Sequence, residues 1–455
     1  MRLHRDQPTI QKYACGVLWN IALNSPVNAA TVAAKGAMPY ILTAMRTHDS
    51  NGLVQDYACR ALRALTVDDM NKVSMCRLGG IETLVTSMRV HASHSNVQKE
   101  ACRTLANVSQ NEQNQVLVAQ GWGIESVIRA LRSHSNIPDV QIAALDALCS
   151  LSFYNDDNQV AIAKCGGLHD VVAALRSHSG IATVVERACN AICNLSLHHS
   201  NSVAFAELGV IPDVVGIMRE HADVSAVQEE ACAVLWALTD DEANQRTVSG
   251  KGGIQLILTA MKAHAGAPKV QLEACRALRN LCRNDANKVI VAAKGGIKSV
   301  LRAMRRHLDE PQLQEQACAT LFNIAFNAEN RGLVVLHGGL ERIISAMKTH
   351  ANSAGVQEQG CSALWTLSLD DASKSVITEK GGVDSIVVAM TVHLSNAGVQ
   401  EDGCRALRRL AKSASARKVI VSRGGIEAIL SAKAQHPGDA AVQRISALAY
   451  RDVKT

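Results

Sequence analysis

Apolar residues recur at helical spacing along this chain, and strict alternation of apolar and polar residues is absent. Residues 227–239 show the pattern clearly, with apolar positions at Val227, Ala231, Cys232, Leu235 and Leu238. This spacing predicts a long helix, because such side chains fall on one helix face. Asp240, Asp241 and Asn244 follow, and we interpret them as turn and N-cap residues. A short helix is expected at about 243–250 and a medium one at 254–264, separated by Gly252-Gly253.

This unit of three helices repeats along the sequence. A glutamine marks the start of each long helix, and Val185 fills the one gap in the series Gln11, Gln55, Gln98, Gln141, Gln228, Gln271, Gln314, Gln357, Gln400 and Gln443. Every step is 43 or 44 residues. Cysteines, histidines and asparagines recur in the same phase. So many columns in register predict a stacked array, since one unit cannot bury its apolar face alone.

The repeat pattern is incomplete at both ends of this sequence. A long helix is expected around 10–23 and another around 442–450. We therefore predict one array over residues 1–455, with incomplete repeats at about 1–25 and 440–455. Two sets of residues would lack stacking neighbours: Ile10, Tyr13, Ala14 and Val17 at one end, and Val442, Ile445, Leu448 and Tyr450 at the other. The chain would then be part of a longer array, or its ends would dock on a partner or on another copy.

The repeated unit resembles the armadillo repeat. The Gly pair before the second helix, and the Leu-x-Asn segment of the third at Leu105-Ala106-Asn107 and Leu278-Arg279-Asn280, are similar to the family's pattern. The resemblance covers essentially the whole sequence. It implies an all-α fold, a right-handed superhelical solenoid of about ten 43-residue three-helix armadillo-type repeats.

Composition agrees with such an array and limits its location. Aromatic residues are only 3% of the chain, so the core must consist of small aliphatic side chains and cysteine. The N-terminus has no apolar signal segment, and no apolar run reaches the ~18–20 residues that span a membrane. We therefore expect a protein that is neither secreted nor membrane-inserted. The 14 cysteines are expected to be unpaired thiols, which indicates the cytoplasm, with the nucleus or the cilium as alternatives.

The repeated cysteines and histidines are interpreted as scaffold. Equivalent residues of neighbouring repeats lie about one helix layer apart, roughly 8–10 Å, which exceeds the ~7 Å between Cα atoms that a disulfide spans. The histidines would bond backbone carbonyls at helix ends, with pH sensing as an alternative. No nucleotide-binding, zinc-protease or catalytic-triad motif is present. We predict no catalytic residue, no metal site, no cofactor and no enzymatic activity.

The resemblance implies a concave groove, lined by the third helices, that holds an extended peptide. The groove asparagine of the family corresponds to Asn20, Asn107, Asn194, Asn280 and Asn323. Its side-chain amide offers a donor and an acceptor to a bound backbone. Nuclear-import adaptors place a tryptophan one turn earlier, but four arginines occupy that column here: Arg60, Arg103, Arg276 and Arg405. Basic localisation peptides would be repelled, which argues against an import role.

Arginine and aromatic residues also gather in the next column. It contains Trp19, Arg63, Trp236, Arg279, Phe322, Trp365 and Arg408, and Arg409 follows. Arginine and tryptophan are enriched in interface hot spots. We predict a groove for an extended segment with acidic and apolar residues, similar to the basic groove of β-catenin-like members. The alternative is that the arginines solvate a helix face and the tryptophans fill gaps between repeats.

These patterns favour a protein-binding scaffold. The alternatives are a structural scaffold of a larger assembly, for example axonemal, through end-to-end or surface docking, and a regulatory arm of a longer multidomain protein. Nucleic acid is disfavoured as a partner, because acids alternate with the arginines. Self-association through the uncapped ends is a further hypothesis.

Overall fold

The computed structural model describes every residue, 1–455, and contains 31 α-helices, one short 3-10 helix (η1, Arg2–His4) and no strand. The helices form two compact units, Met1–Glu220 and His221–Thr455. After the first long helix, α1, lengths of nine, eleven and then fourteen or fifteen residues recur in that order. These are the short, medium and long helices that the sequence predicts, so the all-α, armadillo-type pattern is confirmed.

In the first unit the long third helices are α1 (Pro8–Ala22), α4 (Gly52–Leu65), α7 (Ser95–Val108), α10 (Pro138–Ser152) and α13 (Ala182–Leu195). The short first helices are α2 (Pro26–Ala34), α5 (Asp69–Arg77), α8 (Glu112–Gln120), α11 (Asp156–Lys164) and α14 (His199–Glu207). The second helices are α3 (Ala37–Thr47), α6 (Gly80–Val90), α9 (Gly123–Ser133), α12 (Gly167–Ser177) and α15 (Val210–Glu220).

In the second unit the third helices are α16 (Ser225–Leu238), α19 (Pro268–Leu281), α22 (Pro311–Ile324), α25 (Ala354–Leu367), α28 (Ala397–Leu410) and α31 (Ala440–Lys454). The first helices are α17 (Glu242–Gly250), α20 (Asp285–Ala293), α23 (Ala328–Leu336), α26 (Asp371–Glu379) and α29 (Ala414–Ser422). The second helices are α18 (Gly253–Ala263), α21 (Gly296–Arg306), α24 (Gly339–Thr349), α27 (Gly382–Val392) and α30 (Gly425–Gln435).

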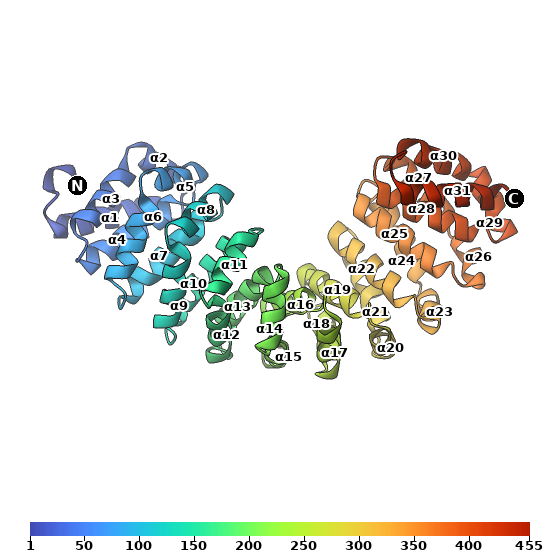
Figure 1. Cartoon of the computed structure of the whole chain (residues 1–455), viewed down its shortest axis with the longest axis horizontal. Helices are drawn as coiled ribbons and strands as arrows, with labels where there is room; N and C mark the ends of the chain where they lie inside the picture. Colours follow the sequence, from blue (N-terminus) through green and yellow to red (C-terminus); the bar gives the residue numbers. More distant parts are fainter. The chain divides into compact units, whose positions relative to one another are not determined.

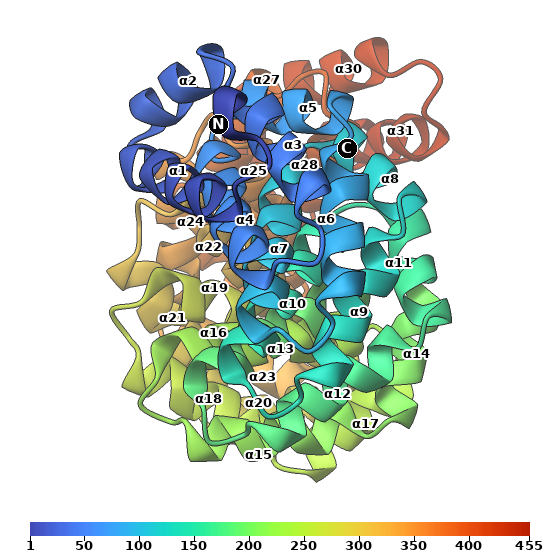
Figure 2. The same cartoon turned by 90° about the vertical axis from the view of Figure 1, so that its left-hand side faces the viewer.

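Third helices pack against third helices within each unit. The row α1, α4, α7, α10, α13 runs through the first unit, and the row α16, α19, α22, α25, α28, α31 through the second (Figure 1). Figure 2 shows the second helices α6, α9 and α12 as a separate row beside the third helices of the first unit. The residues that a third helix turns away from these neighbours therefore form one continuous surface in each unit.

The short helices begin at a side-chain cap, and here one detail of the sequence interpretation is wrong. Asp241 is the N-cap of α17, and its Oδ1 accepts hydrogen bonds from the backbone N–H groups of Ala243 and Asn244. Asn244 is not a cap. It is buried in the first turn of α17, and its Nδ2 donates to the carbonyl of Leu238, 2.8 Å away, at the end of α16. This asparagine therefore ties a short helix to the long helix before it.

A glycine with a left-handed backbone conformation precedes every second helix except α9, as predicted. Gly252 has φ +82°. At the equivalent place in the first unit stands Trp122, with φ +64° and a side chain that is 68% exposed. A bulky residue is strained at positive φ. Because the ring is largely exposed, its packing offsets little of this strain.

Replacing Trp122 with glycine is therefore expected to stabilise the protein. The gain should be about 1 kcal/mol, because glycine removes the left-handed strain. A rise in the urea midpoint of the first unit would show this. The matched control is Gly252→Ala, which introduces the same strain just before α18 and should shift the midpoint of the second unit downward. A lower midpoint for Trp122→Gly would show that the exposed ring stabilises the fold.

The histidine and glutamine columns join neighbouring repeats. His350 Nε2 lies 2.6 Å from the carbonyl oxygen of Leu308, in the loop that follows the preceding second helix. On the following third helix, α25, Gln357 Nε2 donates to the carbonyls of Met347 and His350 at 2.8 and 2.9 Å. The prediction that the histidines bond backbone carbonyls at helix ends is confirmed. The glutamines add the caps that the last turn of each second helix needs.

The cysteine column lies in the core. Cys102, Cys275 and Cys318 have no exposed surface, and burial raises the pKa of each thiol to about 12. All cysteines are free thiols. The interpretation of this column as small apolar residues at helix contacts is therefore confirmed.

The two chain ends differ from each other. On α1 the side chains of Ile10, Tyr13 and Val17 are exposed, as expected for an uncovered helix face. On α31 the expectation is wrong for Val442 and Ile445, which are only 1% and 9% exposed because this helix packs against α28 and α30. Leu448 and Tyr450 are half-buried. Self-association through the chain ends stays a prediction.

No single helix has both the length and the apolar character of a membrane span. The bent pair α14 and α15 reaches that length and composition only when the two helices are taken together.

Candidate functional site

The predicted groove residues all lie on third helices and all reach solvent. The first unit holds Asn20 on α1, Arg60 and Arg63 on α4, Arg103 and Asn107 on α7, and Asn194 on α13. The second unit holds Trp236 on α16; Arg276, Arg279 and Asn280 on α19; Phe322 and Asn323 on α22; Trp365 on α25; and Arg405, Arg408 and Arg409 on α28. Each unit thus carries its own set.

Three of the predicted asparagines donate a side-chain amide hydrogen bond to another part of the protein. The Nδ2 of Asn107, Asn280 and Asn323 donates to a carbonyl at the end of the preceding third helix, at 3.1, 3.1 and 2.8 Å. The acceptors are the carbonyls of Arg63, Trp236 and Arg279. Asn107 Nδ2 also donates to the hydroxyl of Thr66 at 3.4 Å. The amides of Asn280 and Asn323 are held in a fixed orientation, and each keeps a second N–H and its oxygen for another molecule.

The other two asparagines do not follow this pattern. Asn194 Nδ2 donates at 3.4 Å to the side-chain oxygen of Asn190 on the same helix. Asn20 lies on α1, before which no third helix packs in its unit, and its side chain is exposed. The structure therefore brings together only part of the predicted asparagine series.

The tryptophans pack beneath arginines of the following repeat. The Arg60 guanidinium lies 5.1 Å from the centre of the Trp19 ring, Arg276 lies 5.2 Å from Trp236, and Arg405 lies 5.7 Å from Trp365. Each such stack contributes about 0.5–1 kcal/mol at a partly exposed site. Tryptophans thus do fill the junctions between repeats, as the alternative interpretation proposes, while part of each ring stays exposed.

Most of the arginines are also paired with acids, which sequence reasoning missed. Arg60 forms two hydrogen bonds to Asp56, at 2.8 and 3.1 Å. Arg276 pairs with Glu273 at 2.8 Å. Burial raises the pKa of the Glu273 carboxyl, although Arg276 acts in the opposite direction. The signal was available, since these acids lie three or four residues before their arginines on the same helix face.

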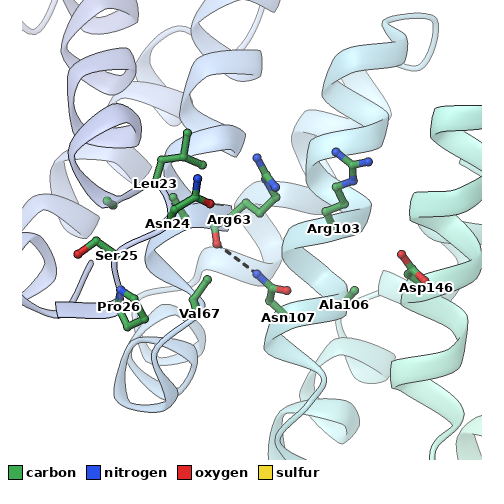
Figure 3. A pocket seen from close by; sticks show the side chains of 12 residues that line it. Leu23, Asn24, Ser25, Pro26, Arg63, Val67, Arg103, Ala106, Asn107 and Asp146 are labelled. Carbon is green, nitrogen blue, oxygen red and sulfur yellow. Dashed lines mark hydrogen bonds between the residues drawn. The ribbon is translucent and has the colours of Figure 1, made fainter. Parts of the chain in front are cut away.

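Figure 3 shows a cavity of about 600 Å³ in the first unit, between α1, α4, α7 and α10. Arg63, Arg103, Asn107 and Asp146 line it from three successive third helices. Arg63 pairs with Glu100 at 2.7 Å, and Arg103 lies 3.7 Å from the same carboxylate. The cavity therefore has charges of both signs.

In the second unit three aromatic rings form one cluster. The Phe322 ring centre lies 4.9 Å from that of Phe326 and 6.1 Å from that of Trp365, and the third pair is 6.0 Å apart. Phe326 is 43% exposed and was missed from the sequence, because it lies just past the end of α22. Its spacing of four residues from Phe322 was the available signal.

Arg279 and Arg409 stand on the helices that flank this cluster, and neither of them forms an ion pair with a carboxylate. Arg279 Nη1 donates to the side-chain oxygen of Gln316 at 3.0 Å. Arg409 Nη2 donates to the carbonyl of Leu369 at 3.0 Å. The second unit thus presents an apolar cluster with one unpaired cation on each side.

Comparisons with known proteins agree with this architecture. A family model described as the GAC ARM domain matches residues 104–447, and one described as the LRRK2 ARM repeat matches residues 1–170. The chain belongs to the armadillo-repeat family. No curated protein matches it.

Solved structures resemble these armadillo repeats in fold. The crystal structure of an engineered protein is 25% identical, with a TM-score of 0.75 over 92% of this chain and 99% of that one. A second engineered protein is 25% identical, covers 54% of this chain and 98% of its own, and has a TM-score of 0.49. A structure reported for a phosphorylation switch between cadherin and beta-catenin is 16% identical, with a TM-score of 0.49 over 96% of this chain and 98% of that one. An armadillo fold is typical of protein-binding scaffolds.

Proposed function

We propose that this armadillo protein is an interaction scaffold whose third helices bind an extended peptide segment with acidic and apolar residues. The observation that carries the proposal is the partly exposed cluster of Phe322, Phe326 and Trp365, which lies between α19 and α28 with the unpaired Arg279 and Arg409. An aromatic cluster beside arginine is the composition of an interface hot spot. The proposal includes no catalytic role, no cofactor and no nucleic acid.

Three features suit an extended partner. The aromatic cluster can take an apolar side chain, and Arg279 or Arg409 can take an acidic one. Asn280 and Asn323, whose amides are fixed by the neighbouring helix, offer the remaining N–H and the oxygen to a peptide backbone. Arg276, by contrast, is neutralised by Glu273 and should contribute little attraction for an acid.

Affinity capture from the native extract tests the proposal. Wild-type protein, Arg279→Glu and the control Arg302→Glu, an exposed arginine on the second helix α21, are compared by quantitative mass spectrometry. With Arg279→Glu, the recovery of partners that bind the third-helix surface should fall about tenfold or more, since the change turns attraction for an acidic side chain into repulsion. Recovery should stay constant with Arg302→Glu. Equal recovery of every captured protein by Arg279→Glu and wild type would contradict the proposal.

For its location we propose the cytoplasm or the nucleus, with the cilium as a variant of the former. The support is that all 14 cysteines are free thiols and that most lie in the core, where oxidation would disrupt packing. It stays a prediction that the whole chain, 1–455, forms one array.

A further inference from the structure

A second cavity, of about 400 Å³, lies in the second unit between α25, α28 and α31. Its lining includes five cations and no acid: Arg405, Arg408, Arg409, Lys412 and Arg444. Its apolar lining comes from Trp365 and Leu369 on one side and from Ile445 and Leu448 on the other. A cavity lined by several cations and by apolar side chains suits a ligand that has an anionic group beside an apolar one.

The carboxylates around this cavity do not balance its cations. Arg408 and Lys412 share a single oxygen of Asp452, at 3.0 and 3.3 Å, and Arg451 lies 3.3 Å from the other oxygen. Asp452 is only 8% exposed. Three cations therefore share one carboxylate, and this group alone keeps a surplus of positive charge.

The remaining cations add to the surplus. Arg409 donates only to main-chain oxygens, those of Ser368 and Leu369. Arg444 is exposed on α31 and has no carboxylate within ion-pairing distance. Only Arg405 is fully compensated, since it pairs with both Glu401 and Asp402. The ligand that suits this cavity must carry more than one negative charge.

We propose that this cavity binds a phosphorylated side chain of the extended segment, with an apolar residue of the same segment against Leu369 and Ile445. A phosphate carries about −1.5 to −2 charges and three acceptor oxygens, whereas a carboxylate carries one charge. Arginine guanidinium groups match phosphate with paired hydrogen bonds. This proposal rests on the proposed function and adds the chemistry of one residue of its partner.

Short fluorescent degenerate peptides with a central phosphoserine, serine or aspartate test the proposal by anisotropy. The phosphoserine pool should bind wild-type protein with a Kd at least about tenfold below that of the serine pool, and aspartate should fall between them. Arg444→Glu should remove most of this preference, and so should Arg409→Gln. The exposed arginines of α21 supply the matched control: Arg302→Glu/Arg305→Glu should leave it intact.

Each alternative outcome has a defined meaning. Equal Kd values for the phosphoserine and serine pools would overturn this proposal, and so would a preference that survives Arg444→Glu and Arg409→Gln. If the serine pool still binds and Trp365→Ala abolishes its binding, the proposed function stands without the phosphate site. Arg444-dependent binding to phosphatidylcholine vesicles that contain a phosphoinositide, without a phosphoserine preference, would assign the cavity to a membrane surface and overturn the proposal. Competition by inorganic phosphate as strong as that by phosphopeptide would reject the peptide as the ligand.

Discussion

Replacing Trp365 with alanine is expected to weaken binding of the groove partner by about 30-fold or more, roughly 2 kcal/mol or above. The reason is the position of this ring. It contacts the aromatic cluster through Phe322 and Phe326, lines the basic cavity, and lies under the Arg405 guanidinium. One substitution thus removes the apolar anchor and one wall of the neighbouring cavity. The Kd of each partner identified by affinity capture, measured by calorimetry, would show the loss.

Two controls separate binding from folding. Trp365→Phe keeps an aromatic ring in the cluster and should lose less than Trp365→Ala. Trp122→Ala removes a more exposed tryptophan that lies in the turn before α9, away from the third helices, and should leave the Kd unchanged. If Trp122→Ala and Trp365→Ala weaken binding equally, the third helices of the second unit are not the partner surface.

The helices could be predicted from the sequence because local signals and packing signals agree. The apolar spacing, the Asp241 cap and the Gly252 stop all give the same boundaries, and α16, α17 and α18 match the expected ranges within two residues. The prediction was wrong at one position, where the residue type fits two different structural roles. Asn244 was interpreted as a cap, yet its amide bonds a carbonyl of the preceding helix, six residues earlier, and short-range spacing does not show such a bond.

The third-helix positions of the site could be predicted, but their chemistry could not. A repeat places equivalent residues on equivalent helices, so the columns containing Arg279 and Trp365 had to reach a common surface. Which arginines are neutralised depends on rotamers and on neighbouring repeats. Arg276 has Glu273 within 2.8 Å, whereas Arg279, one turn later, has only an amide. A column of arginines therefore overstates the available positive charge.

The basic cavity was missed for a related reason. Its members come from α25, α28 and α31, and Arg444 lies outside the columns that the family resemblance selects. Asp452, the acid that three cations share, is in the last turns of α31, beyond the range expected for that helix. Charge balance within a cavity requires the distances between three helices, and sequence spacing gives only those within one.

Replacing the buried Gln357 with leucine is expected to lower the free energy of unfolding by about 1–3 kcal/mol. Leucine has a similar volume, so packing should be largely kept. Gln357, however, is 1% exposed, and its side-chain amide donates hydrogen bonds to the carbonyls of Met347 and His350. The His350 carbonyl would keep the backbone N–H of Ser353, 2.9 Å away, as a donor. The Met347 carbonyl would stay buried without this donor, and a buried unpaired carbonyl costs roughly 1–3 kcal/mol.

Urea unfolding followed by circular dichroism measures the loss. Hydrogen exchange of the α24 amides would locate it, since repeats can unfold in parts. Gln312→Leu, at an exposed site near the start of α22, is the matched control and should change stability by less than about 0.5 kcal/mol. Gln271 and Gln400 make the same pair of bonds, to Met261 and His264 and to Met390 and His393. Their leucine variants should therefore lose similar amounts, and a loss confined to Gln357 would assign the cause to packing around Met347 rather than to the unpaired methionine carbonyl.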